Sequence, residues 1–199
     1  MQTRSSGTAG PVWSRICTSG RISAPGSPAS PRWASALTHG SITIGVADVV
    51  ELARTFPATP IVMGHVGGVL GYGPYAGKAS AILRQWKRAM SELATCPNVV
   101  VKLGGMVNRG AGFDFHNAPA PPSSEAIAEL WRPYIETCIE LFGATRCMFE
   151  SNFPVDKMAI GYAALWNAFK RITAGASHDE KLALFAGTAA RIYRLADVG

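Results

Sequence analysis

The chain has 199 residues, of which 48% are hydrophobic and 16% are charged. That length leaves room for one domain with a sizeable core, and this balance is typical of a globular protein rather than a disordered one. No apolar run approaches the roughly 18 residues that a membrane-spanning helix needs, so no membrane partner is expected. The four cysteines lack the spacing of a metal site and no secretory signal is visible, so we predict buried, reduced thiols in a cytoplasmic protein.

The first 46 residues differ in composition from the rest of the chain. Four of the six net positive charges come from arginines in this segment, which contains no lysine and no acidic residue. It is rich in Ser, Gly and Pro and lacks a helical or strand period, so we expect disorder. Two alternatives are a basic arm for an anionic partner and out-of-frame translation of a GC-rich gene. The arginines lie about ten residues apart and form no dense patch, so no nucleic acid partner is expected.

From residue 47 onward, helical and strand patterns alternate along the chain. Continuous apolar runs predict buried strands at 61–65, 98–103 and 146–150. The predicted helices cover 48–56, 79–95, 121–143, 159–174, 178–186 and 188–195. Pro133 is expected to bend or divide the third of these helices. The alternation indicates an α/β fold, with a parallel sheet and crossover helices, as a single domain from 47 to 199.

Polar residues follow each predicted strand at its carboxyl end, which is where parallel α/β folds bind ligands. The first strand ends at His65, and the second carries Lys102 and leads into a loop that contains Arg109. The third strand is followed by Glu150, Ser151, Asn152 and Asp156. Because these strand ends meet at one edge of the sheet, we expect the polar groups to converge on a site for a small-molecule substrate.

Two of these residues allow more than one interpretation. His65 could be a metal ligand, a proton carrier or a donor to a substrate carbonyl, or it could simply be satisfied by a backbone carbonyl. Lys102 lies in an apolar strand, where burying an unpaired ammonium is costly. It is therefore expected either to hold a substrate carboxylate or to form a salt bridge with Glu150. The Gly-rich stretch "HVGGVLGYG" lacks a phosphate-binding motif and is interpreted as a lid or a tight turn.

Four motifs follow one another along the chain: "TPIVMGHVGG", "CPNVVVKLGGM", "FGATRCMFESNFPVDK" and "ALFAGTAARIYRL". In this order they resemble the C-terminal half of the amidohydrolase-related family, within the amidohydrolase superfamily. The resemblance covers about residues 47–197 and implies the last strands of a (β/α)8 TIM-type barrel. It also implies a hydrolase, lactonase-like or acting on another cyclic ester or amide of a small organic acid, with a divalent metal such as zinc as cofactor.

The resemblance also implies an incomplete barrel. A barrel of this type needs about 250 residues, and the range 47–199 falls well short of that length. The first four strands would be missing or replaced by the first 46 residues. An open barrel exposes a sheet edge and an apolar flank, so we expect either poor stability of the chain alone or association with another copy.

By the same resemblance, His65 matches the histidine of the family's sixth strand, and it would be the metal ligand there. Asn152 stands where the family's S-D-W-P motif carries its aspartate. The family's HxH motif is absent, and His39, the candidate for a further ligand, is not expected to lie in a strand. An asparagine takes up no proton at neutral pH and is a weak metal ligand, so the ligand set is incomplete.

Two functional hypotheses from different classes follow. In the first, the chain is a hydrolase in which His65 polarises or orients the carbonyl and Asn152 hydrogen-bonds substrate or water. The predicted substrate-binding residues are Lys102, Arg109 and Ser151. The carboxylate that the family's aspartate supplies would come from Glu150 or Asp156, unless the reaction needs none. In the second hypothesis, the chain is a non-catalytic barrel fragment or a small-ligand-binding module.

Overall fold

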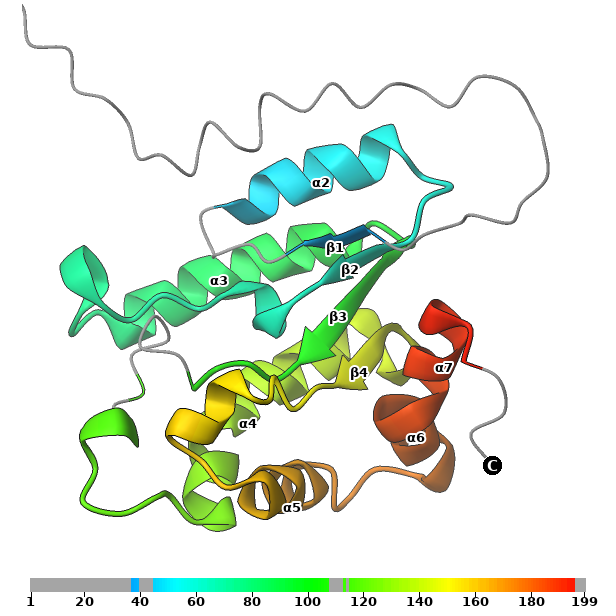
Figure 1. The fold of residues 1–199 in the computed structure, drawn as a ribbon. Coiled ribbons are helices and arrows are strands. Elements are labelled where there is room, and N and C mark those ends of the chain that lie inside the picture. The colour runs from blue at the N-terminus through cyan, green and yellow to red at the C-terminus, as the bar shows by residue number, and fades with distance from the viewer. Residues whose placement is uncertain (1–36, 40–44, 108–112, 114, 196–199) are drawn as a thin grey trace, which may run out of the picture. The chain divides into compact units, whose positions relative to one another are not determined.

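The computed structural model describes residues 37–39, 45–107, 113 and 115–195 (Figure 1). The disorder predicted for residues 1–46 thus lies almost wholly outside the described residues. Within the described ranges, four short strands form one parallel sheet and follow each other across it in chain order. They are β1 (Leu37–His39), β2 (Ile61–Met63), β3 (Val99–Leu103) and β4 (Cys147–Phe149). This parallel pairing confirms the predicted α/β class.

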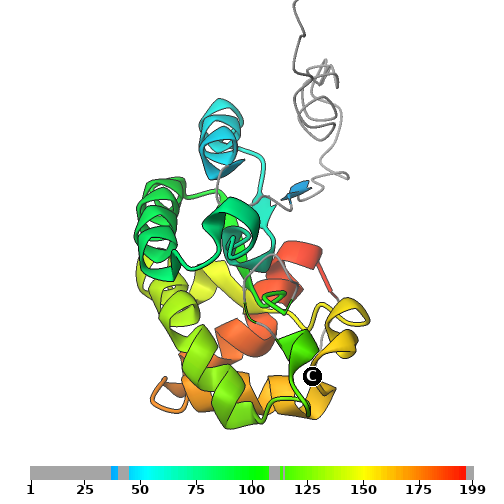
Figure 2. The ribbon, with the colours of Figure 1, turned by 90° about the vertical axis from the view of Figure 1, so that its left-hand side faces the viewer.

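Each of the three crossovers between neighbouring strands carries a helix. These helices are α2 (Val46–Thr55), α3 (Ala79–Ala94) and α4 (Ser124–Phe142). After β4 follow α5 (Tyr162–Ile172), α6 (His178–Leu182) and α7 (Thr188–Tyr193). Figure 2 shows α2, α3 and α4 stacked along one side of the sheet, with α7 on the other side. Among the described residues, no helix combines the length and the apolar character that a membrane crossing requires.

The boundaries of α3 and α4 follow from local sequence. In α3 the buried side chains recur at helical spacing, at Ile82, Trp86, Met90 and Leu93. In α4 the N-cap is Ser123, whose hydroxyl accepts a hydrogen bond from the Ala126 N–H at 3.3 Å. Gly143 ends this helix with a φ of 75°, a conformation that glycine adopts without strain.

The two faces of the sheet are covered by different elements. Residues of one parity along the strands face α2, α3 and α4 and form the main core. These residues are Ile61, Met63, Val99, Val101, Leu103, Cys147 and Phe149. The strand residues that point to the opposite face form a second, smaller cluster with α7. This cluster consists of Val62, Val100 and Met148 from the strands and Ala189 and Ile192 from α7. Both faces of the parallel sheet are therefore apolar, which explains the continuous hydrophobic runs in the sequence.

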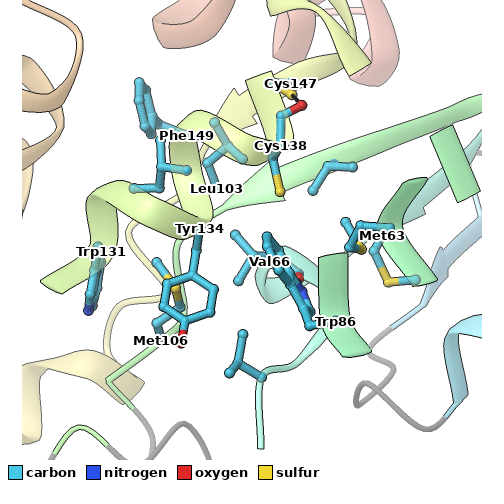
Figure 3. Packing of buried hydrophobic residues seen from close by; sticks show 14 of the residues in the cluster. Met63, Val66, Trp86, Leu103, Met106, Trp131, Tyr134, Cys138, Cys147 and Phe149 are labelled. Atoms are coloured by element: carbon cyan, nitrogen blue, oxygen red, sulfur yellow. Dashed lines mark hydrogen bonds between the residues drawn. The ribbon is translucent and has the colours of Figure 1, made fainter. Parts of the chain in front are cut away.

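Aromatic and sulfur-containing side chains fill the centre of the main core (Figure 3). The rings of Trp86 and Tyr134 meet edge to face, with centroids 5.1 Å apart. Cys96, Cys138 and Cys147 are buried free thiols, as predicted, and Cys17 lies outside the described residues. Burial raises the pKa of Cys138 well above its ordinary value and that of Cys147 to about 12, so both remain protonated and unreactive near neutral pH.

Three details differ from the sequence-based predictions. The prediction that His39 lies outside a strand is wrong, because it ends β1 and pairs with Met63. Of the two effects predicted for Pro133, division of the helix does not occur, since α4 runs through this residue without interruption. The two helices expected at 178–186 and 188–195 are joined by a π-helical turn, η8 (Ala183–Gly187), instead of being separate.

Asn98 connects the last turn of α2 and the segment after it to the start of β3. Its side-chain nitrogen Nδ2 lies 3.2, 3.1 and 3.0 Å from the carbonyl oxygens of Ala53, Phe56 and Thr59. Replacing Asn98 by Ala removes this donor from three carbonyl groups, so we expect the free energy of unfolding to fall by about 1–3 kcal/mol. Urea denaturation measures this change. The exposed Asn167→Ala variant in α5 is the control, and equal stability of the two variants would contradict the assigned role.

Candidate functional site

His65 lies two residues after the end of β2, at the start of a tight turn, η2 (His65–Gly67). His65 and Val66 have φ angles of 52° and 48°, in the left-handed region that non-glycine residues rarely adopt. The indole N–H of the fully buried Trp86 donates to the Val66 carbonyl at 2.7 Å and fixes this turn. Such strained residues persist only where surrounding contacts hold them, and they are common at functional sites.

Glu150 follows β4 and is the direct partner of His65. Its Oε1 atom lies 2.6 Å from Nδ1 of the imidazole and accepts a second hydrogen bond from the His65 backbone N–H at 3.1 Å. Its other oxygen, Oε2, lies 3.5 Å from Nζ of Lys102 in β3. The carboxylate therefore joins groups from three neighbouring strands, which confirms the predicted convergence of these three residues. Of the two roles weighed for Lys102, the structure contains the salt bridge to Glu150.

The three charges shift one another's protonation. The hydrogen bond to Glu150 raises the pKa of His65 above its ordinary value of 6.5, although burial of the ring opposes this shift. Burial alone would raise the pKa of Glu150, but the hydrogen bond and charge of His65, with the charge of Lys102, hold it below the usual range. At neutral pH Glu150 is ionised, and the imidazolium form of His65 is favoured relative to free histidine.

Asn152 and Asp156 form a second polar pair in the loop after β4. Asn152 has a φ of 51°, and its Nδ2 donates to Oδ1 of Asp156 at 2.7 Å. The Asp156 backbone N–H donates back to the Asn152 carbonyl at 3.1 Å. Asp156 is only 1% exposed, and its negative charge contributes to the raised pKa of His65. The hydroxyl of Ser151 accepts from the Phe153 N–H at 3.3 Å, and Arg109 lies outside the described residues.

Sequence reasoning missed the role of two glycines between these groups. A Cβ atom on Gly104 would lie 2.3 Å from the carbonyl oxygen of Glu150. A Cβ atom on Gly105, whose φ is 64°, would lie 2.1 Å from Nδ1 of His65. The diglycine after β3 therefore lets the His65 and Glu150 side chains meet above it. The "LGGM" string was the available signal, because paired glycines at a strand end indicate close approach of another group.

The donor set does not fit the zinc site that the family resemblance implies. Zinc in proteins takes three or four ligands from Cys, His, Asp and Glu. In the described part of the chain, no group of three such side chains is arranged to hold a metal ion. Nδ1 of His65 is engaged by Glu150, and the amide N–H of Asn152, rather than a ligating oxygen, faces Asp156.

This arrangement can carry out proton transfer. With Nδ1 held against the Glu150 carboxylate, the imidazole has a fixed orientation and Nε2 is the atom left to accept or deliver a proton. A carboxylate in this position also stabilises the imidazolium that forms when Nε2 takes a proton. The side chain of His65 is 36% exposed, while that of Glu150 is only 12% exposed.

Comparisons with known proteins find relatives for most of the described chain. A family model described as Amidohydrolase matches residues 34–195. The uncharacterized protein y4mH of Sinorhizobium fredii is 42% identical over 149 residues, which cover 74% of this chain and 43% of that protein. A protein named L-fucono-1,5-lactonase from Burkholderia multivorans is 32% identical over 114 residues, or 57% of this chain and 36% of that protein.

A solved structure extends the similarity to three dimensions. An amidohydrolase from Burkholderia multivorans, crystallised with bound zinc, aligns with a TM-score of 0.68 at 26% identity. The alignment covers 80% of this chain and 52% of that one. The chain thus spans less than half the length of the curated relatives it matches and about half of the solved one.

Substitution of Gly105 tests the close approach of His65. Gly105→Ala places a methyl group on the imidazole, so we expect a loss of about 1–3 kcal/mol in unfolding free energy. The control is Gly73→Ala, because Gly73 also has a positive φ, 58°, but a Cβ there would meet nothing within 4 Å. Both variants are compared by urea denaturation. A loss for Gly105→Ala no larger than that for Gly73→Ala would mean that the imidazole moves aside freely.

The His65–Glu150 pair should also make stability depend on pH. The depressed pKa of Glu150 stabilises the fold above about 4.5, and this contribution is lost as pH falls through the lower folded value. The raised pKa of His65 stabilises the fold below about 6.5, and this contribution is lost as pH rises through the higher folded value. Both contributions are present together between those two pH values.

We therefore expect Glu150→Gln to lower the unfolding free energy most in that window. The loss should be about 1–2 kcal/mol, since His65 is partly exposed and its charge is screened by solvent. Denaturation curves recorded from acidic to alkaline pH give the measurement. Glu129→Gln, at an exposed position of α4, is the control. A pH-independent difference between Glu150→Gln and the parent would exclude the ion pair as its cause.

Proposed function

We propose, because this chain belongs to the amidohydrolase family, that it hydrolyses a C–O or C–N bond in a small cyclic substrate. The family match over residues 34–195 confirms the resemblance drawn from the four sequence motifs. The substrate class that we propose is a lactone, or another cyclic ester or amide, derived from a small organic acid. Two relatives carry the name L-fucono-1,5-lactonase, at 32% and 29% identity, and this supports a lactone as the first choice.

The observation that carries this proposal is the 2.6 Å contact between Nδ1 of His65 and Oε1 of Glu150. Glu150 orients the ring, and Nε2 removes a proton from a water molecule as the water oxygen attacks the carbonyl carbon. Glu150 stabilises the resulting imidazolium. Nε2 then returns the proton to the leaving oxygen or nitrogen as the ring bond breaks. The product is an open chain that carries a carboxylate and a hydroxyl or amino group.

Other residues would bind the substrate in this scheme. Lys102 and Arg109 are proposed to hold an anionic group of the substrate, and Ser151 and Asn152 to hydrogen-bond the substrate or the attacking water. A cyclic ester suits this site because it needs less activation than an amide, and the donor set here does not fit a zinc ion that would supply further activation. Glu150 therefore takes the place of the carboxylate that the family's aspartate would provide.

We also propose that the four strands are half of a (β/α)8 barrel. The support is the parallel sheet in chain order, the helices in its crossovers, and the similarity to a solved amidohydrolase over 52% of its length. The proposed domain includes β1, and thus begins before residue 47. A second copy of the chain would cover the open edge of such a half barrel. The proposed setting is the cytoplasm, with a small molecule and not nucleic acid as the ligand.

Hydrolysis assays with His65→Ala test the proposal. Proton release from a panel of lactones is followed with a pH indicator, and the open-chain products of a panel of cyclic amides are followed by chromatography. We expect His65→Ala to lower kcat/KM by about a hundredfold or more, as loss of a general base does. His178→Ala is the matched control, because His178 lies exposed at the start of α6. Near-normal turnover in His65→Ala would refute the assigned role, and a parent chain without turnover would favour the non-catalytic alternative.

A further inference from the structure

The closing helix α7 is fixed to the turn that precedes β4. The hydroxyl of Thr188 donates to the carbonyl oxygen of Ala144 at 3.3 Å. Near the other end of the helix, the guanidinium of Arg191 donates to the carbonyl oxygen of Thr145 at 2.5 Å. These two hydrogen bonds tie α7 to consecutive residues of the short helix η6 (Ala144–Arg146), which leads into β4. The position of α7 relative to the sheet is therefore set along its length.

Apolar contacts hold the same helix against the second face of the sheet. Ala189 and Ile192 pack on Val62, Val100 and Met148, which come from β2, β3 and β4. In β3, Val100 and Lys102 have the same parity, so Lys102 emerges from the face that α7 covers, two residues nearer the carboxyl end. Tyr193, the last residue of α7, follows Ile192 directly and lies where it can reach Lys102.

The ammonium group of Lys102 lies between a ring and a carboxylate. Its Nζ atom is 5.5 Å from the centroid of the Tyr193 ring, within the range of a cation–π contact. The same atom is 3.5 Å from Oε2 of Glu150. The Lys102 side chain is 24% exposed, so these two neighbours shield much of it from water. Burial lowers the pKa of Lys102, but the Glu150 charge and the Tyr193 hydroxyl outweigh burial and keep it charged.

We propose that Tyr193 is a positioning residue of the site, which holds the Lys102 ammonium against Glu150 and thereby fixes the carboxylate that orients His65. This inference rests on the proposed function, because its catalytic consequence passes through the His65–Glu150 pair. It makes the closing helix a part of the site rather than only a cover for the sheet. A lysine has four rotatable side-chain bonds, so without a second contact its ammonium can turn toward solvent and leave one carboxylate oxygen unsupported.

Chemical labelling tests the contact without any need for turnover. The folded chain is acetylated with a limiting amount of an amine-reactive ester, and the rate at each lysine is measured by peptide mass spectrometry. We expect Tyr193→Leu to speed the acetylation of Lys102 by about fivefold, as the loss of a shielded cation–π contact predicts. Tyr193→Phe keeps the ring and should give a smaller increase. Lys170, exposed in the last turn of α5, is the internal reference whose rate should not change.

A matched variant separates this effect from a general loosening of the fold. Tyr162 is 54% exposed and Tyr193 is 40% exposed, so Tyr162→Leu removes a comparable tyrosine from another helix. Tyr162→Leu should leave the Lys102 rate within error of the parent. An unchanged Lys102 rate in Tyr193→Leu would overturn the proposal, and so would an equal increase in Tyr162→Leu. If Tyr193→Leu does not fold, as judged by circular dichroism, the graded effect of Tyr193→Phe decides.

Kinetics test the catalytic part of the inference. With the best substrate of the panel, Tyr193→Leu should lower kcat/KM by about fivefold in the parent. In a Lys102→Met background the same change should have no further effect, since the group that Tyr193 holds is gone. Additive losses would overturn the positioning role. One outcome is that the parent chain hydrolyses no substrate while Lys102 is acetylated fastest in Tyr193→Leu, more slowly in Tyr193→Phe and slowest in the parent. In that case the contact between Tyr193 and Lys102 stands and only the proposed function fails.

Discussion

The hydrogen bond between His65 and Glu150 joins the ends of β2 and β4 across the strand that separates them, and the rest of the site depends on it. Two side chains can meet over a central strand only if that strand presents no side chain beneath them. Gly104 and Gly105 meet this condition, because a Cβ atom on either would overlap Glu150 or His65. The strained backbone at His65 then turns the imidazole toward the carboxylate, and Trp86 holds that turn from the core.

The contact with Asp156 explains why an asparagine occupies position 152. Its amide N–H donates to the buried carboxylate of Asp156 at 2.7 Å, a contact that an aspartate at the same position could not make. Two carboxylates at that distance repel each other unless one takes up a proton or a cation lies between them. With asparagine at position 152, the described charges of the site are two carboxylates, one lysine and one histidine that becomes charged. These charges sum to zero when His65 is protonated, and to −1 when its imidazole is neutral.

Much of this arrangement was predictable, and the missed parts share a physical reason. The strand-end rule placed His65, Lys102 and Glu150 at one edge of the sheet, because buried parallel strands leave a clear apolar signal. The rule said nothing of backbone conformation, so the positive φ angles of His65 and Asn152 were not foreseen. β1 was missed because its three residues are too short to show a period. Tyr193 was missed because its role depends on how α7 lies across the sheet, a tertiary contact that no local pattern encodes.

The charged groups of the site also belong to a series of contacts that leads from the loop after β2 to the C-terminal helix α7. His65 contacts Glu150, Glu150 contacts Lys102, and Lys102 faces Tyr193. Each member comes from a different element, so the geometry of the imidazole depends on the packing of α7 as well as on the sheet. Apolar contacts hold α7 against β2, β3 and β4. A shift of the sheet would therefore disturb both the His65 end and the Tyr193 end of this series of contacts. The geometry of the His65–Glu150 pair therefore depends on the integrity of the second core.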